Sequence, residues 1–239
     1  MDEMAMLVMP EDWDRAVVVA AHPDDIEYGI ASAVARWTGQ GKQVSYLLAT
    51  RGEAGIAGMH PDQVGPLRVE EELRGAALVG VTQVEFLDHR DGLVEYGILL
   101  RRDLAAAFRK VQPEVIITMS FDLTWGDEGP VNHSDHRAVG LAVLDACRDA
   151  ANEWVFPEAG PRCETIRDAY VVGVGNPTHF VDVTATIDAG VASLRQHQAY
   201  IDGLGRDFDP DQFLKDFAGY VGLGAGCEYA AAFHRYPMG

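Results

Sequence analysis

The sequence predicts an α/β protein with three layers, a Rossmann-like fold whose mostly parallel sheet carries its site at the carboxyl ends of the strands. Two observations support this. Short apolar runs rich in β-branched residues alternate with longer helical stretches, as in βαβ units. Polar clusters rich in His and Asp directly follow several of these runs, where open α/β sheets bind ligands. No repeat or long linker divides the chain, so we expect one domain over residues 1–239.

The predicted strands are short apolar segments, the first of which (AVVVAA) is buried. They cover residues 16–21, 44–49, 82–87, 115–119, 170–174 and 180–183. The predicted helices lie between and after them, at residues 26–38, 67–79, 98–111, 133–150 and 185–200. Gly80 ends the second helix as a C-cap. The Gly- and Asp-rich stretch 203–226 predicts a surface loop with a short helix near Phe213.

Composition excludes several function classes. The chain has 19 Lys and Arg against 37 Asp and Glu, a formal net charge of −18, so it lacks the basic character of nucleic-acid binding and gives no support for docking on an anionic membrane. No apolar run approaches the ~20 residues that span a bilayer, and the N-terminal segment has no basic signal region. Three scattered cysteines form no C-x-x-C pair, so we expect neither disulfides nor a thiolate zinc site. A cytoplasmic location is the resulting expectation.

Three polar motifs stand at carboxyl ends of predicted strands and can therefore converge on one crevice. They are AHPDDIE at residues 21–27, TRGE at residues 50–53 and NHSDHR at residues 132–137, the last opening a helix. A second His-Pro-Asp, at residues 60–62, follows a Gly-rich loop instead of a strand, and we expect it to lie in a mobile loop.

The first and third motifs have the residue types of a catalytic zinc site, which takes three His or carboxylate ligands and leaves one position for water. His22 and Asp25 are three residues apart on a strand-to-helix turn. His133 and His136 are three apart on one helix face, and only one of them need be a ligand. Zinc lowers the pKa of bound water to about 7, and Asp24 is then the expected general base.

The remaining polar residues of the third motif have expected supporting roles. His133 can protonate the leaving amine or stabilise the oxyanion of a tetrahedral intermediate. Asp135 can orient an imidazole as a hydrogen-bond partner.

These motifs resemble the PIG-L (LmbE-like) family of zinc deacetylases. The resemblance extends over most of the chain: RVEEELRGAALVG at residues 68–80 resembles the family's R-x-x-E…A-x-x-L-G helix, and EYAAAF at residues 228–233 resembles its Y-A-E-A-F segment. It implies hydrolysis of N-acetyl groups on glucosamine-containing compounds or, in some members, of thiol conjugates.

The resemblance also implies residue roles. His22, Asp25 and His136 would bind one Zn²⁺ per chain, Asp24 would be the general base, and His133 the general acid or electrostatic stabiliser. Arg51 and Glu53 would lie beside the substrate, a small N-acylated molecule, although these two residues can also be read as a structural ion pair.

Other positions depart from the family pattern or allow two readings. Ser134 replaces a proline, which removes no ligand, and His197-Gln198-Ala199-Tyr200 replaces H-x-S-Q, which bears on the substrate and not on the metal. Asp91 is either a turn residue or a substrate contact, and His197 is either packed or functional. Trp125, before the third motif, is either a core residue or part of the site wall.

Three rival functions differ in their requirements. A two-metal phosphoesterase needs about twice the ligands, and a catalytically inactive binding module should have lost the base or a ligand. An amidase acting on a thiol conjugate would use the same residues as a deacetylase. A zincin protease is excluded because the chain has no H-E-x-x-H.

The oligomeric state is a separate expectation. Three apolar residues late in the chain could form a contact between subunits of a homo-oligomer: Phe217, Tyr220 and Leu223.

Overall fold

The computed structural model describes residues 6–126, 129–205 and 207–238. Its centre is one eight-stranded mixed sheet with the order β1-β7-β8-β6-β5-β2-β3-β4. The strands are β1 (Leu7–Val8), β2 (Arg15–Ala20), β3 (Gln43–Leu48), β4 (Gln83–Phe86), β5 (Val115–Met119), β6 (Asp168–Val172), β7 (His179–Asp182) and β8 (Ala230–Pro237). All pairs are parallel except those that β8 makes with β6 and β7, so the predicted mostly parallel α/β sheet is confirmed.

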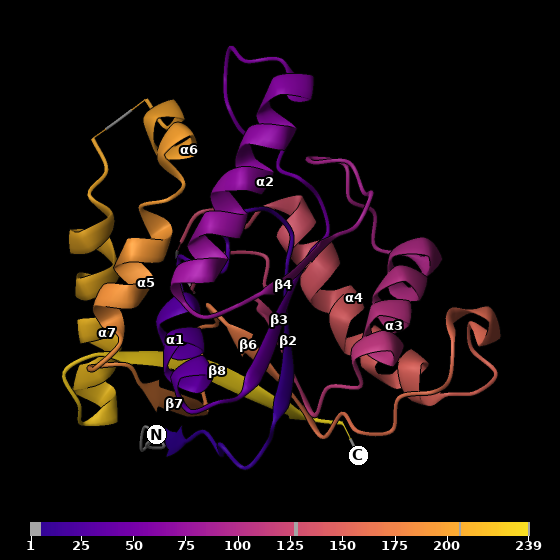
Figure 1. Cartoon of the computed structure of the whole chain (residues 1–239). Coiled ribbons are helices and arrows are strands. Elements are labelled where there is room, and N and C mark those ends of the chain that lie inside the picture. The colour runs from indigo at the N-terminus through magenta and orange to yellow at the C-terminus, as the bar shows by residue number, and fades with distance from the viewer. Residues whose placement is uncertain (1–5, 127–128, 206, 239) are drawn as a thin grey trace.

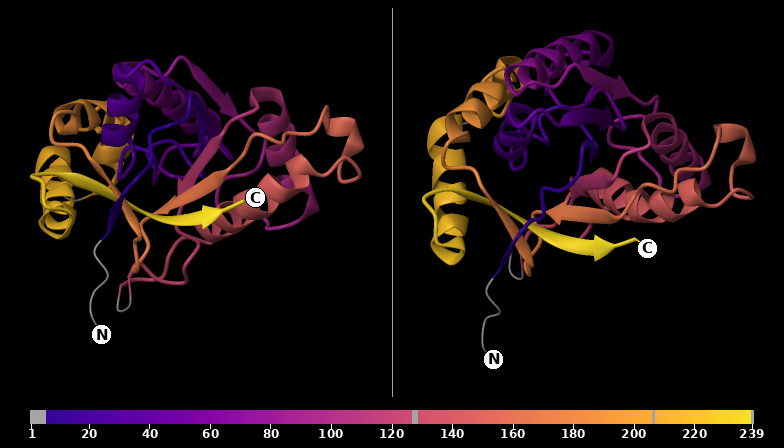
Figure 2. Two further views of the ribbon diagram at one scale, coloured as in Figure 1. Left: turned by 90° about the horizontal axis from the view of Figure 1, so that it is seen from below. Right: turned by 60° about the horizontal axis from the view of Figure 1, so that its bottom comes forward.

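Helices cover both faces of this sheet, which gives the three predicted layers (Figures 1 and 2). On one face α3 packs on α4, and on the other α5 contacts α1, α2 and α7. The bounds are α1 (Ala31–Gly39), α2 (Pro61–Leu78), α3 (Ile98–Val111), α4 (Ser134–Ala151), α5 (Ile187–Leu194), α6 (Gln198–Gly203) and α7 (Pro210–Ala225), with one 3-10 turn at Pro157–Ala159. None of the described helices combines the length and apolar character needed to cross a membrane.

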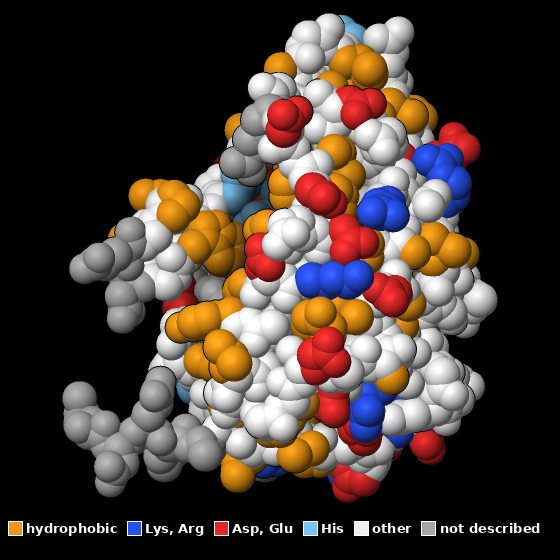
Figure 3. Space-filling view, turned by 90° about the vertical axis from the view of Figure 1, so that its left-hand side faces the viewer, with side chains coloured by type: hydrophobic (Ala, Val, Ile, Leu, Met, Phe, Trp, Pro, Cys, Tyr) orange, Lys and Arg blue, Asp and Glu red, His pale blue; other side chains and the backbone are white. Residues whose placement is uncertain are grey.

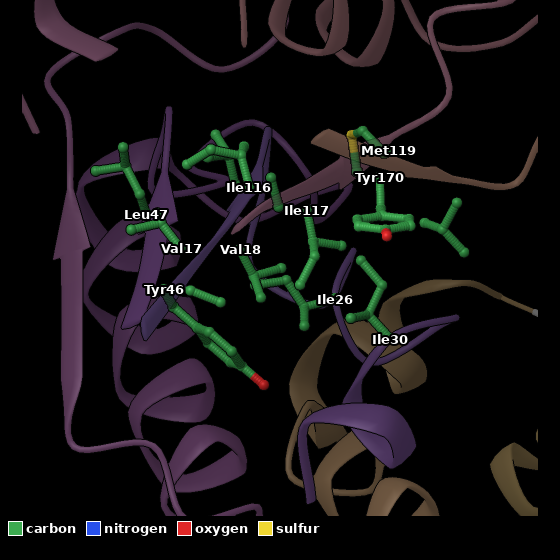
Figure 4. Close-up of a cluster of buried hydrophobic side chains, with 14 of the residues drawn as sticks. Val17, Val18, Ile26, Ile30, Tyr46, Leu47, Ile116, Ile117, Met119 and Tyr170 are labelled. Carbon is green, nitrogen blue, oxygen red and sulfur yellow. The ribbon is translucent and has the colours of Figure 1, made fainter. Parts of the chain in front are cut away.

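The core explains why β2 and β5 read as uninterrupted apolar runs. Strands covered on both faces lose the alternation of apolar and polar residues, and all five residues of β5 are buried. Figure 4 shows Ile26 and Ile30 in the same cluster as Val18 and Ile117. Because Ile26 lies within the first polar motif and Ile30 follows it, their burial fixes that motif over the end of β2.

Several predicted boundaries are wrong. The helix predicted at 26–38 begins only at Ala31, because residues 23–30 form turns over the site. The helix predicted at 67–79 begins at Pro61, and the expected mobile His-Pro-Asp loop is its start: the backbone N–H of Asp62 donates to His60 Nδ1 at 3.3 Å. The helix predicted at 185–200 is two helices, α5 and α6.

The prediction of a surface loop at 203–226 is also wrong. Residues 210–225 form the 16-residue helix α7, with Asp209 as N-cap and Pro210 at its first turn. Glycine allows close packing here, because a Cβ on Gly222 would lie 2.6 Å from the carbonyl oxygens of Cys227 and Glu228. Packing of α7 on β8 and α5 outweighs the low helix propensity of its glycines.

Candidate active site

The first and third polar motifs meet at the carboxyl ends of β2 and β5, around a cavity of about 680 Å³, and the second motif follows the neighbouring strand β3 without lining that cavity. Figure 3 shows a hollow in this side of the molecule with histidine side chains inside it and hydrophobic side chains around it. Six residues predicted for the site line the cavity: His22, Asp24, Asp25, Asp91, His133 and His136.

Asp25 joins the first motif to the third. Its Oδ2 accepts hydrogen bonds from the backbone N–H groups of Ala21 (3.1 Å) and His22 (2.7 Å), which closes the turn after β2. Its Oδ1 lies 3.1 Å from His136 Nε2, and its Oδ2 lies 3.4 Å from His22 Nδ1. Burial alone would raise the pKa of Asp25, but His136 and His22 outweigh it and hold that pKa well below its usual value.

Asn132 determines how the imidazole of His136 is oriented. The Asn132 amide donates to the carbonyl oxygens of Ser120 (2.8 Å) and Asp122 (3.1 Å), so its Oδ1 faces His136 Nδ1 at 3.0 Å. His136 therefore carries its hydrogen on Nδ1 and turns Nε2 toward Asp25. Two acceptor atoms 3.1 Å apart are favourable only with a proton or a cation between them, and His with carboxylate is a donor set that zinc accepts.

His22 is surrounded by carboxylates. Besides its contact with Asp25, its Nε2 lies 3.1 Å from Asp91 Oδ1 and 3.2 Å from Asp135 Oδ2. Burial would lower the pKa of His22, but Asp25, Asp135 and Asp91 raise it well above its usual value. Among the described residues, two groups at this site could hold a metal ion, His22 with His133 and His136, and His22 with Asp91 and Asp135.

Asp24 stands on the same turn in a left-handed conformation, with φ of 91°. Its Oδ1 pairs with Arg68 Nη2 at 2.9 Å, while its buried Oδ2 has no hydrogen-bond partner among the described residues. Arg68 also donates to the carbonyl oxygens of Pro23 and Gly52, so it fixes both the turn and the carboxylate. Burial raises the pKa of Asp24 to about 6, against the opposing effect of Arg68.

His133 is the N-cap of α4. Its Nδ1 accepts a hydrogen bond from the backbone N–H of Asp135 at 3.2 Å, so its other nitrogen, Nε2, carries the hydrogen in the neutral ring. Burial and then the neighbouring His22 lower the pKa of His133, which favours this neutral form. The structure gives the cap to His133 and leaves Asn132 to hold His136.

Asp135 is fully buried and does not line the cavity. It accepts hydrogen bonds from the backbone N–H groups of Gly92 (2.7 Å) and Val94 (3.3 Å) and lies beside His22 Nε2. Its position agrees with the expected role of orienting an imidazole, and the imidazole it contacts is that of His22.

The residues expected to contact the substrate do not all line the cavity. Asp91 lines the cavity and contacts His22. Glu53 instead accepts from the backbone N–H of Asp91 at 3.0 Å, and Arg51 pairs with Asp88 at 2.9 Å, not with Glu53. Because Arg51 and Glu53 contact different partners, the structural ion pair between them is wrong, and neither residue lines the cavity.

His197 does not reach the cavity either. Its side chain is fully buried, with Nε2 at 3.6 Å from Glu27 Oε2 and 3.8 Å from Glu72 Oε2. Of the two alternatives for His197, the structure shows the packed one, because Glu27 of the 21–30 turn and Glu72 of α2 lie against the buried ring. Of the two alternatives for Trp125, the site wall is confirmed.

Comparison with known proteins identifies relatives with deacetylase names. The chain is 25% identical over 236 residues to a diacetylchitobiose deacetylase of Thermococcus kodakarensis, covering 95% of this chain and 84% of that protein. It is 28% identical over 261 aligned positions to a 1D-myo-inositol 2-acetamido-2-deoxy-alpha-D-glucopyranoside deacetylase of Kineococcus radiotolerans, covering 83% and 72%.

A solved structure has the same fold. The N,N'-diacetylchitobiose deacetylase from Pyrococcus horikoshii superposes with a TM-score of 0.84 at 22% identity, covering 95% of this chain and 85% of that chain. The family model described as PIG-L, GlcNAc-PI de-N-acetylase, matches residues 17–147, which contain all three polar motifs. This chain therefore belongs to the PIG-L family, whose relatives compared here are named as deacetylases, hydrolases of carbon–nitrogen bonds.

Proposed function

We propose that this protein is a zinc-dependent hydrolase that cleaves the N-acetyl amide of an amino sugar or a related small polar molecule. The observation that supports this best is the Asp25 carboxylate between His22 and His136, beside a second carboxylate, Asp24, on the same turn. The relatives' names favour N-acetylated amino sugars as the substrate class.

The proposed metal ligands are His22, Asp25 and His136, with one Zn²⁺ per chain. Zinc in such a site supplies a Lewis acid and a bound water of lowered pKa. Both groups of possible ligands at this site contain His22, which favours one ion over the two that a phosphoesterase would use.

Asp24 is the proposed general base. Arg68 holds Oδ1, so Oδ2 is the oxygen available to take a proton from the attacking water. A pKa raised to about 6 still leaves the carboxylate ionised at neutral pH and makes it a stronger proton acceptor than an ordinary aspartate.

His133 is the proposed proton donor to the leaving amine. Because Nδ1 accepts the cap hydrogen bond, Nε2–H is its donor, and the same N–H can stabilise negative charge on the amide oxygen. Asp91 is the substrate contact best supported, since it lines the cavity. Glu53 would then act by holding the backbone of Asp91.

A first experiment is to remove metal by dialysis, restore Zn²⁺ in steps, and measure acetate released from N-acetylglucosamine compounds while bound metal is counted by elemental analysis. We expect activity to reach a plateau near one zinc per chain. Tight binding of one zinc without acetate release would favour an amidase of thiol conjugates or a binding module. If no zinc binds, the proposal is wrong.

Two further expectations, one on cellular location and one on oligomeric state, are part of this proposal. A small soluble substrate suits a cytoplasmic enzyme, which fractionation of cells would test. Tyr220 and Leu223 are strongly exposed on α7 and suit a homo-oligomer; sedimentation of Leu223→Asp beside the wild type would test that contact.

A further inference from the structure

The cavity has two chemically different sides. Asp24, Arg68 and Asp91 form a polar side next to the proposed metal ligands. The other side is apolar and is formed by residues from the 21–30 turn, from the end of β6 and from α7. These residues are Tyr28, Val172, Val174, Phe213 and Phe217.

The apolar side is an ordered wall. Three aromatic rings pack together, with centroid distances of 5.5 Å for Tyr28 and Phe213, 5.8 Å for Tyr28 and Phe208, and 5.4 Å for Phe208 and Phe213. Such tilted and edge contacts fix ring positions. Phe217 is four residues after Phe213 and therefore lies on the same face of α7.

This wall is continuous with the reacting groups. Tyr28 stands three residues after Asp25 in the turn that also carries His22 and Asp24. A substrate whose amide lies beside Asp24 therefore has the wall within reach.

The wall is also larger than an acetyl group requires. Phe213 and Phe217 are 41% and 43% exposed although both line the cavity. Exposed aromatic surface inside a concave site marks a place where a ligand buries apolar area, and the single methyl of an acetyl group covers little of it.

We infer that the natural substrate carries an alkyl or aryl group in addition to its N-acylated amino group, and that this group packs against Tyr28, Phe213 and Phe217. The inference rests on the proposed function for the amide end of the substrate. The apolar group belongs either to an aglycone attached to the sugar or to an acyl chain longer than acetyl.

Binding tests the wall without turnover. Isothermal titration calorimetry with the zinc-loaded protein compares the affinities of the octyl and methyl β-glycosides of glucosamine. We expect the octyl glycoside to bind at least about tenfold more tightly, because each buried methylene favours binding. Phe217→Ser should reduce this preference to about threefold or less. Tyr220→Ser removes an aromatic ring of the same helix outside the cavity and should leave the preference unchanged.

Turnover identifies the source of the apolar group. A higher kcat/KM for octyl than for methyl glycosides of N-acetylglucosamine supports an aglycone, and a higher value for N-hexanoyl- than for N-acetylglucosamine supports an acyl chain. In either case Phe217→Ser should remove the advantage, and Phe213→Leu, which keeps an apolar side chain, should retain most of it.

Equal binding of the octyl and methyl glycosides together with equal binding of N-hexanoyl- and N-acetylglucosamine, or an unchanged preference in Phe217→Ser, would overturn the inference. Neither result depends on hydrolysis. Failure of the proposed function would appear differently, as a retained octyl preference with no acyl group released from any of these compounds.

Discussion

Two groups of histidine and carboxylate side chains lie on either side of the 21–30 turn and have different environments. His22, Asp25 and His136 line the cavity. His197, Glu27 and Glu72 also come within 4.8 Å of one another, but all three are sealed from solvent and away from the cavity. A list of potential metal ligands therefore does not identify an active site. What identifies the active site is that a substrate can reach the residues, and this depends on which side of the turn each residue faces.

The sealed cluster still touches the open one through the backbone. Glu72 Oε2 accepts a hydrogen bond from the backbone N–H of Asp24 at 3.2 Å, and Glu27 accepts one from Ser193 Oγ at 3.0 Å. The cluster thus supports the turn from beneath, and the left-handed conformation of Asp24 is held from two directions, by Glu72 and by Arg68. Variants in the two groups should have separable effects.

The largest expected effect is on catalysis in the open group. Asp24→Asn keeps the shape and tolerates the left-handed backbone, but removes the proposed base. We expect kcat to fall by about 10²–10⁴-fold, measured by acetate release, with bound zinc unchanged by elemental analysis. Activity near that of the wild type would assign the base to another residue.

The next effect is on the metal. Asn132→Ala removes the acceptor that orients His136 through Nδ1. Zinc affinity, measured by competition with a chelating dye, should fall by about 10–100-fold, as is usual for partners of metal-binding histidines. Val131→Ala is the matched control, because Val131 is the neighbour of Asn132 just before α4 and is 68% exposed. An equal loss in both variants would indicate a general disturbance of α4.

A variant in the sealed group should affect stability instead. His197→Leu leaves Glu27 and Glu72 facing each other without the imidazole, so the free energy of unfolding should fall by about 1–3 kcal/mol in urea titrations. KM for N-acetylglucosamine should change less than about twofold, because His197 does not line the cavity and so should contribute little to ground-state binding of the substrate. A large rise in KM with unchanged stability would instead make His197 a substrate residue.

The last expected effect is a change of stability with pH. Burial raises the pKa of Glu27 to about 8, above its usual value near 4.5. Between pH 4.5 and pH 8 the folded protein therefore binds more protons than the unfolded chain. The contribution of Glu27 to the free energy of unfolding is present at acidic pH and is lost as the pH rises toward 8. Glu27→Gln should therefore gain stability relative to the wild type as pH rises from 5 to 8, by about 1.4 kcal/mol for each pH unit over which the carboxyl is protonated only in the folded protein. A pH dependence identical to that of the wild type would mean that Glu27 is ionised in the folded protein throughout.

Local patterns in the sequence predicted the central parallel strands well, because strands buried on both faces must be continuous apolar runs. The prediction for α3, residues 98–111, matches its observed bounds. The antiparallel strand inside the sheet was not predictable in this way. β8 begins with three alanines and was not recognised as a strand, because its pairing with β6 and β7 stabilises it and its own β-propensity does not.

The site residues divide along the same line. The cavity-lining residues attached directly to a strand end or helix start were predicted for the site: His22, Asp24 and Asp25 after β2, and His133 and His136 at α4. Arg68 and Asn132 were not assigned their roles. Arg68 contacts Asp24 across 44 positions, and no pattern within one segment encodes such a contact. Asn132 is only four positions from His136, but its orientation toward that ring depends on its hydrogen bonds to Ser120 and Asp122.

The sequence by itself determined the alternation of strands and helices, the convergence of three motifs at strand ends and the residue types that can bind a metal. These follow from local periodicity and from the geometry of parallel sheets, where consecutive carboxyl ends share an edge. The tertiary structure alone decided that His197 faces inward, that residues 210–225 form a helix, and that its aromatic face closes one side of the cavity. These outcomes depend on packing between segments distant in the chain, a free energy that no single segment carries.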